Sequence, residues 1–139
     1  FGKVMNKQTL SRLMNAEREI VSEKGPFVLF ALFLRDDAPN VWDLVASATW
    51  LDRNKQAGLA YLIKKVRSHL AAGEFLMLSR FVLLEEGNPI LRTIHRSLQV
   101  EHAEAEVVDC TFDGLHLRRA YIITSKPRTR KEKRKQPAA

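Results

Sequence analysis

The sequence contains a single cysteine, Cys110, and no apolar run as long as a membrane span. One cysteine excludes an intramolecular disulfide framework and suits a reducing compartment, so we expect a cytoplasmic protein. A helix needs about 20 consecutive apolar residues to cross a bilayer. The N-terminal sequence FGKVMNKQTLSR also lacks the apolar centre of a signal peptide. We therefore expect no association with a membrane.

Glycine is scarce as well, with 6 residues that nowhere cluster. The patterns G-x-x-x-x-G-K-[ST] and G-x-G-x-x-G are absent, so the common glycine-rich loops that hold phosphates are missing. No two of the 4 histidines stand four residues apart, and Cys110 lies outside any C-x-x-C. The serines lack the G-x-S-x-G context of an activated nucleophile. We expect no cofactor, no metal and no catalytic residue.

Two alternatives to this expectation rest on particular residues. Asp36, Asp37 and Asp43 surround the first predicted turn, and carboxylates can hold Mg²⁺ for a small metal-assisted phosphodiester hydrolase. However, no E-x-K stands on a predicted strand, and aspartate is an ordinary turn residue. The second alternative is a structural protein–protein interaction subunit whose Trp42 and Trp50 surface meets another chain.

The apolar pattern predicts three helices and five strands. Helical spacing covers residues 9–23, residues 52–73, and a segment that begins after the cap Asn88 and Pro89. Apolar or alternating runs predict strands, and two turns join four of them into antiparallel hairpins, at residues 36–40 and at Asp113-Gly114. The run 75–84 fits a helix or a strand, and we predict a strand because it lies between two strong helices. The predicted strands are residues 27–34, 41–50, 75–84, 106–112 and 115–124.

These elements predict an α/β domain of α+β-like character over residues 1–125, built on a five-stranded mixed sheet. Right-handed crossovers would place the second and third helices on one face of the sheet. The N-terminal helix would then cover the other face. A two-residue turn would pair Cys110 with Leu117 and set Asp109 opposite Arg118 as a charge pair. Residues 126–139 are predicted to be a basic disordered tail.

The net charge of +7 is unevenly distributed along the chain. Residues 126–135 hold seven Lys or Arg and one Glu, whereas residues 1–125 hold 16 basic and 15 acidic residues. Within the predicted domain, residues 53–98 carry eight basic residues against three acidic ones. The second helix contains no acidic residue between positions 53 and 73. The excess of cations therefore lies in the tail and in the two central helices.

Helical geometry places Lys64 opposite the apolar stripe of the second helix, and Arg92 and Arg96 on the outer side of the third. On one sheet face these surfaces would merge into a basic patch suited to phosphate. The plain alternative is a solvated face whose cations keep the protein soluble. We expect a non-enzymatic binding or regulatory module that contacts nucleic-acid backbone without reading sequence. The expected contact residues are Lys64, Lys65, Arg67, Arg92, Arg96, Arg128, Arg130, Lys131, Lys133, Arg134 and Lys135.

Overall fold

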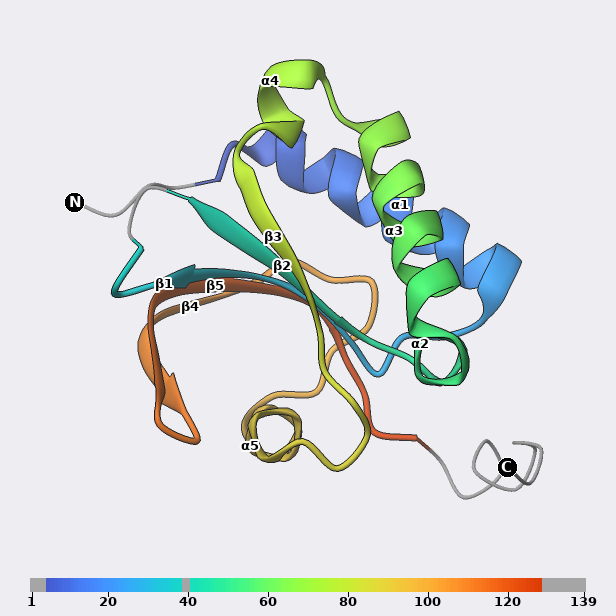
Figure 1. The fold of residues 1–139 in the computed structure, drawn as a ribbon. Coiled ribbons are helices and arrows are strands. Elements are labelled where there is room, and N and C mark those ends of the chain that lie inside the picture. The colour runs from blue at the N-terminus through green and yellow to red at the C-terminus, as the bar shows by residue number, and fades with distance from the viewer. Residues whose placement is uncertain (1–4, 39–40, 129–139) are drawn as a thin grey trace.

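The computed structural model describes residues 5–38 and 41–128, and shows an α+β protein built on one mixed sheet (Figure 1). Helices lie against both faces of this sheet. The elements in chain order are α1 (Lys7–Lys24), β1 (Leu29–Arg35), β2 (Trp42–Ser47), α2 (Thr49–Arg53), α3 (Lys55–His69), α4 (Ala72–Phe75), β3 (Leu78–Leu83), α5 (Pro89–Ser97), β4 (Ala105–Phe112) and β5 (Leu115–Ser125).

Asparagine side chains begin the three longer helices. Asn6, Asn54 and Asn88 each accept a hydrogen bond from a backbone N–H in the first turn, at 2.7, 3.1 and 2.9 Å. These bonds satisfy N–H groups that have no partner inside the helix. Gly25 ends α1 with a φ of 112°, a conformation that favours glycine. The predicted helix boundaries at these positions are confirmed to within a few residues.

The five strands form a mixed sheet in the order β3-β2-β1-β5-β4, which confirms the predicted sheet and both hairpins. β1 pairs antiparallel with β2 and with β5, and β4 pairs antiparallel with β5. β2 and β3 are parallel and are joined across α3. The register of the last hairpin also follows the prediction, because Cys110 pairs with Leu117.

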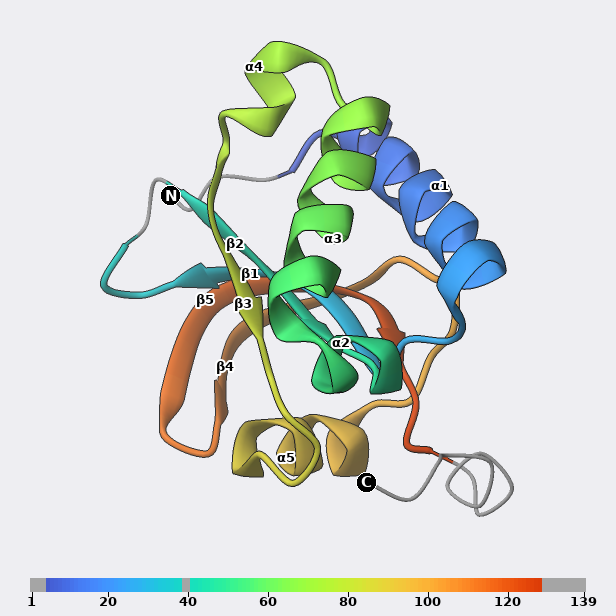
Figure 2. The ribbon, with the colours of Figure 1, turned by 45° about the vertical axis from the view of Figure 1, so that its right-hand side comes forward.

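The helices are distributed over the sheet differently from the prediction. Leu13 of α1 and Leu62 of α3 belong to one buried cluster, so these two helices pack together on the same face. Leu91 and Ile94 of α5 belong to a second cluster on the opposite face (Figure 2). The prediction that the second and third helices share a face, with the N-terminal helix alone on the other, is therefore wrong.

Strand direction explains this error. The right-handed rule governs connections between parallel strands of one sheet. It applies to α3, which joins the parallel neighbours β2 and β3. α5 instead joins β3 and β4, which lie at opposite edges of the sheet and run in opposite directions. The rule therefore places no constraint on α5, which is free to cross the other face.

The second predicted strand is shorter than expected. β2 ends at Ser47, and Trp50 lies in the short helix α2. Trp42 is fully buried, and the ring of Trp50 packs 5.7 Å from the rings of both Phe27 and Tyr61. Trp42 thus belongs to the core on the α1 and α3 side, and the half-buried Trp50 packs against that core. They do not form the exposed surface that the interaction-subunit alternative requires.

Two further differences concern chain segments near strands. The second predicted helix is split, because α3 ends at His69 and the short α4 precedes β3. At the last hairpin, Asp109 has a φ of 52° and its carboxylate lies 3.0 Å from His116. Arg118 instead donates to Asp36 at 3.2 Å, so the predicted pair between Asp109 and Arg118 is wrong.

Within the described part of the chain, no helix is long and apolar enough to span a membrane.

Candidate nucleic-acid interface

The cations expected to form one patch lie on two sides of the molecule. Lys64, Lys65 and Arg67 belong to α3, whereas Arg92 and Arg96 belong to α5 on the opposite face of the sheet (Figure 2). The five side chains therefore do not form one continuous surface.

The cations of α3 are largely engaged by neighbouring groups. Lys65 Nζ lies 3.1 Å from Glu19 Oε1 and 2.9 Å from Glu23 Oε2, both on α1. Hydrogen bonds to Glu23 and Glu19 raise the pKa of Lys65, so its ammonium group stays charged and is balanced by two carboxylates. The guanidinium of Arg67 lies 5.5 Å from the centre of the Phe75 ring. Of the three expected α3 contacts Lys64, Lys65 and Arg67, Lys64 alone is exposed with no partner among the residues that the structure describes.

The outer surface of α5 has a different character. Arg92 and Arg96 are exposed and stand one helical turn apart, and the helix contains no acidic residue. Neither guanidinium has an ion-pair or hydrogen-bond partner within the described ranges 5–38 and 41–128. The imidazole of His95, on the same helix, points inward, and its Nε2 lies 3.0 Å from the carbonyl oxygen of Val28. Two adjacent arginines are thus left free on this face.

The C-terminal segment passes beside α5. After β5, the N–H of Lys126 donates to the carbonyl oxygen of Val28 at 3.0 Å. Arg128 then reaches Asp52 at 3.1 Å and Glu86 at 2.5 Å, and its side chain is only 5% exposed. The packed structure therefore extends through Arg128, three residues beyond the predicted boundary at 125. The predicted tail residues Arg130, Lys131, Lys133, Arg134 and Lys135 lie outside the described residues.

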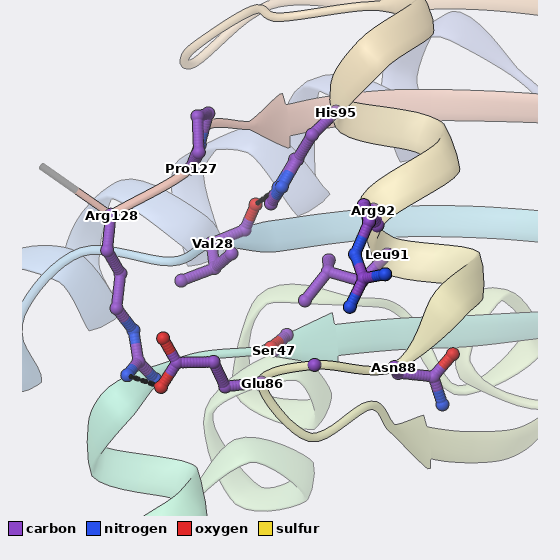
Figure 3. A pocket seen from close by; sticks show the side chains of 10 residues that line it. Val28, Ser47, Glu86, Asn88, Leu91, Arg92, His95, Pro127 and Arg128 are labelled. Carbon is purple, nitrogen blue, oxygen red and sulfur yellow. Dashed lines mark hydrogen bonds and ion pairs between the residues drawn. The ribbon is translucent and has the colours of Figure 1, made fainter.

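A cleft of about 290 Å³ separates α5 from this segment (Figure 3). Arg92 and His95 line it from α5, and Pro127 and Arg128 line it from the C-terminal side (Figure 3). Ser47 also lines the cleft, and its Oγ is buried and has no hydrogen-bond partner among the described residues. α5 and the start of the basic segment thus form two walls of one surface feature.

The three aspartates of the hydrolase alternative are held by arginines. Asp36 accepts from Arg118, and Asp37 accepts from Arg35 at 2.8 Å. Asp43 is buried and accepts from both Arg35 and Arg80, at 2.8 and 2.9 Å. The described residues contain no group of three or more His, Cys, Asp or Glu placed to hold a metal ion. The geometry therefore gives the metal-assisted hydrolase no support.

The sequence reasoning missed a buried polar network behind α1. Glu17 is completely buried and accepts from the hydroxyl of Thr124 at 2.9 Å. Its other oxygen lies 2.5 Å from Nδ1 of His102, whose backbone has a φ of 50°. The position of Glu17 could have indicated this network, because Glu17 lies on the apolar stripe of the first helix, four residues after Leu13. The network joins α1 to the last strand and to the loop before β4.

Comparison of the chain with protein-family models, with curated proteins and with solved structures finds no match.

Proposed function

We propose that the protein is a non-enzymatic binding or regulatory module that contacts the phosphate backbone of nucleic acid through α5 and the basic C-terminal segment. The observation that carries the proposal is the state of Arg92 and Arg96. They are exposed, adjacent and free of carboxylate partners in the described structure, and the chain enters its most basic segment beside the same helix.

The charge arrangement supports phosphate as the partner. A cation that is already paired must break that pair before it can bind a phosphate, whereas Arg92 and Arg96 need only release bound counterions. Arginine also binds phosphate with a planar, two-pronged donor set. Beyond Arg128, the sequence adds five Lys or Arg and one Glu before residue 136. Together with Arg92 and Arg96, these residues provide up to seven cations for one strand of phosphate backbone.

The surface also favours contact without sequence readout. Recognition of unpaired bases commonly uses exposed aromatic side chains on which the bases stack. Among the described residues, the large exposed hydrophobic side chains are Leu76 and Val108, and neither is aromatic. α5 is short, and Arg92 and Arg96 are the charged groups on its outer face. This set can anchor a backbone but offers little to distinguish one base from another.

The test is a salt titration of binding to a labelled DNA duplex and to single-stranded RNA. It compares the full chain, a chain ending at Arg128, and the double variant Arg92→Glu/Arg96→Glu. The matched control is Arg18→Glu/Lys64→Glu, which makes the same change in net charge at two exposed, unpaired cations on the other side of the sheet. The chain is cut after Arg128 because residues 126–128 pack against the domain.

A plot of log K against log[salt] has a slope of about −0.9 for each phosphate contacted on duplex DNA. We expect the α5 variant to lose roughly two contacts, a change in slope of about 1.8. The control variant should keep the slope of the natural chain, and the shortened chain should bind with a smaller slope. Equal losses in the α5 variant and the control would show that net charge alone drives binding. That result, or no binding at low salt, would overturn the proposal.

A further inference from the structure

The strand β3 forms one edge of the sheet in the described chain, where it pairs with β2 alone (Figures 1 and 2). It carries half-exposed apolar side chains on both of its faces. Phe81 and Leu83 pack against the core on the α1 and α3 side, and Val82 packs against the core on the α5 side. An apolar edge strand of this kind is a template for pairing with another strand.

The backbone groups of Phe81 and Leu83 face the open side of β3. Leu84 donates its N–H to the carbonyl oxygen of Ala46 on β2 at 3.0 Å. Because alternate residues of a strand direct their backbone groups to opposite edges, Val82 and Leu84 bond to β2, whereas Phe81 and Leu83 point away from it. Outside the sheet ladder, no hydrogen bond of the described residues involves the backbone of Phe81 or Leu83.

The opposite edge of the sheet, β4, has features that prevent pairing. Asp109 interrupts its extended backbone with a φ of 52°, and Glu106 and Asp109 are exposed charges on the strand. Charged side chains and an irregular backbone are common ways to protect an edge. Within β3 no residue has a positive φ, and the one charged residue, Arg80, is held by Asp43 at 2.9 Å. The β3 edge is therefore the one available for strand pairing.

The sequence of β3 fits a second copy of itself. In an antiparallel pair related by a two-fold axis, residues whose backbone groups point outward must pair with each other. An axis at Val82 meets this condition, since it sets Phe81 opposite Leu83 of the second copy and Val82 opposite its equivalent. Apolar side chains then meet apolar side chains at these positions. An axis at Phe81 would set Arg80 opposite Val82, and an axis at Arg80 would set two guanidinium groups opposite each other.

The charges at the two ends of β3 favour the same arrangement. Arg80 lies near the start of the strand, and Glu85 and Glu86 follow its end. Antiparallel pairing about Val82 brings the start of each strand beside the end of the other, so that Arg80 of one copy approaches the carboxylates of the second. A foreign strand would gain this match only if it carried the same order of charges. A second copy is therefore the partner that the edge fits.

We propose that two copies of the chain associate through β3, which pairs antiparallel with its equivalent about Val82 and joins the two sheets into one. The two-fold axis runs perpendicular to the joined sheet, so both α5 helices lie on the same face of it. The association does not depend on nucleic-acid binding, because Arg92 and Arg96 lie on α5, away from this edge.

Sedimentation velocity of the full chain measures this association. We expect a species of twice the 15.9 kDa chain mass at high micromolar concentration. Val82→Lys places two ammonium groups opposite each other on the axis, so its dimer should be at least about tenfold weaker. The matched control is Val108→Lys, which makes the same change at an exposed residue of the β4 edge and should keep the natural association. A natural chain that stays monomeric, or equal association of the two lysine variants, would overturn the proposal.

Cysteine cross-linking tests the register without adding a charge. Both variants carry Cys110→Ser, which removes the natural cysteine, together with either Val82→Cys or Val108→Cys. Residues opposed on the axis have Cα atoms about 4.5 Å apart, a separation that a disulfide spans. Oxidation should therefore link Val82→Cys into a dimer at least about tenfold faster than Val108→Cys. Similar rates for the two variants would refute pairing about Val82, even where Val82→Lys folds poorly.

Discussion

The buried carboxylate of Glu17 provides a direct test of what holds α1 to the sheet. Replacement by leucine places an apolar side chain of similar size on the buried stripe and removes the acceptor for Thr124 and for His102. Each buried polar group left without a partner costs about 1–3 kcal/mol. Part of this cost is offset because leucine is apolar, so that its burial is favourable. We expect Glu17→Leu to lower the free energy of unfolding by about 2–4 kcal/mol.

Urea denaturation followed by tryptophan fluorescence measures this loss, because Trp42 and Trp50 lie in the same core cluster. The control is Arg18→Leu, an exposed neighbour on α1, which should change stability by less than about 0.5 kcal/mol. Thr124→Val removes one of the stranded groups, so the double variant Glu17→Leu/Thr124→Val should recover about 1 kcal/mol relative to additivity. If Glu17→Leu is as stable as Arg18→Leu, or if the double variant is additive, the network does not stabilise the fold as argued.

Two further predictions concern Glu74 and Asn88. Hydrogen bonds from Thr9 and from the backbone of Ala71, together with Arg12, lower the pKa of Glu74 to about 2 from its usual 4.5. Its carboxylate therefore stabilises the fold fully above pH 4.5, and this contribution is lost as the pH falls towards 2. The thermal stability of Glu74→Gln should depend less on pH across that window than the stability of the natural chain. Parallel curves for the two proteins would contradict the assignment. Asn88→Ala removes the cap of α5 and should lower the free energy of unfolding, measured by urea denaturation, by about 1 kcal/mol. Asn88→Gly should lower it by only a few tenths of a kcal/mol. Equal losses in the two variants would rule out a capping role.

Local features of the fold were readable from the sequence because short-range chemistry decides them. Gly25, Asn88 and the Asp113-Gly114 turn each act over a few residues, and the structure has them where the pattern predicted. The strand at 75–84 was an open choice between two patterns, and β3 lies within it. Its outcome depended on β2 being available as a parallel neighbour.

Features that depend on distant segments were predicted poorly. The face occupied by α5 follows from β3 and β4 lying at opposite edges of the sheet, and no local signal carries that information. Trp50 continues the alternation of β2 in the sequence, yet it turns into α2 and packs against Tyr61, which is eleven residues further along the chain. The alternation over residues 41–50 predicted a strand correctly, but it did not predict that the strand ends at Ser47.

The same distinction governs the candidate interface, because a cation is available to a ligand only if the fold leaves it unpaired. Lys65 and Arg92 look alike in the sequence, since both stand on helical segments without acidic residues. In the structure, two carboxylates of α1 neutralise Lys65, because α1 packs beside α3. α5 has no such neighbour on its outer side within the described residues. The guanidinium groups of Arg92 and Arg96 are therefore not paired with carboxylates and are available to a phosphate. The placement of α1, which the sequence did not reveal, therefore decides which basic helix is the better candidate for binding phosphate.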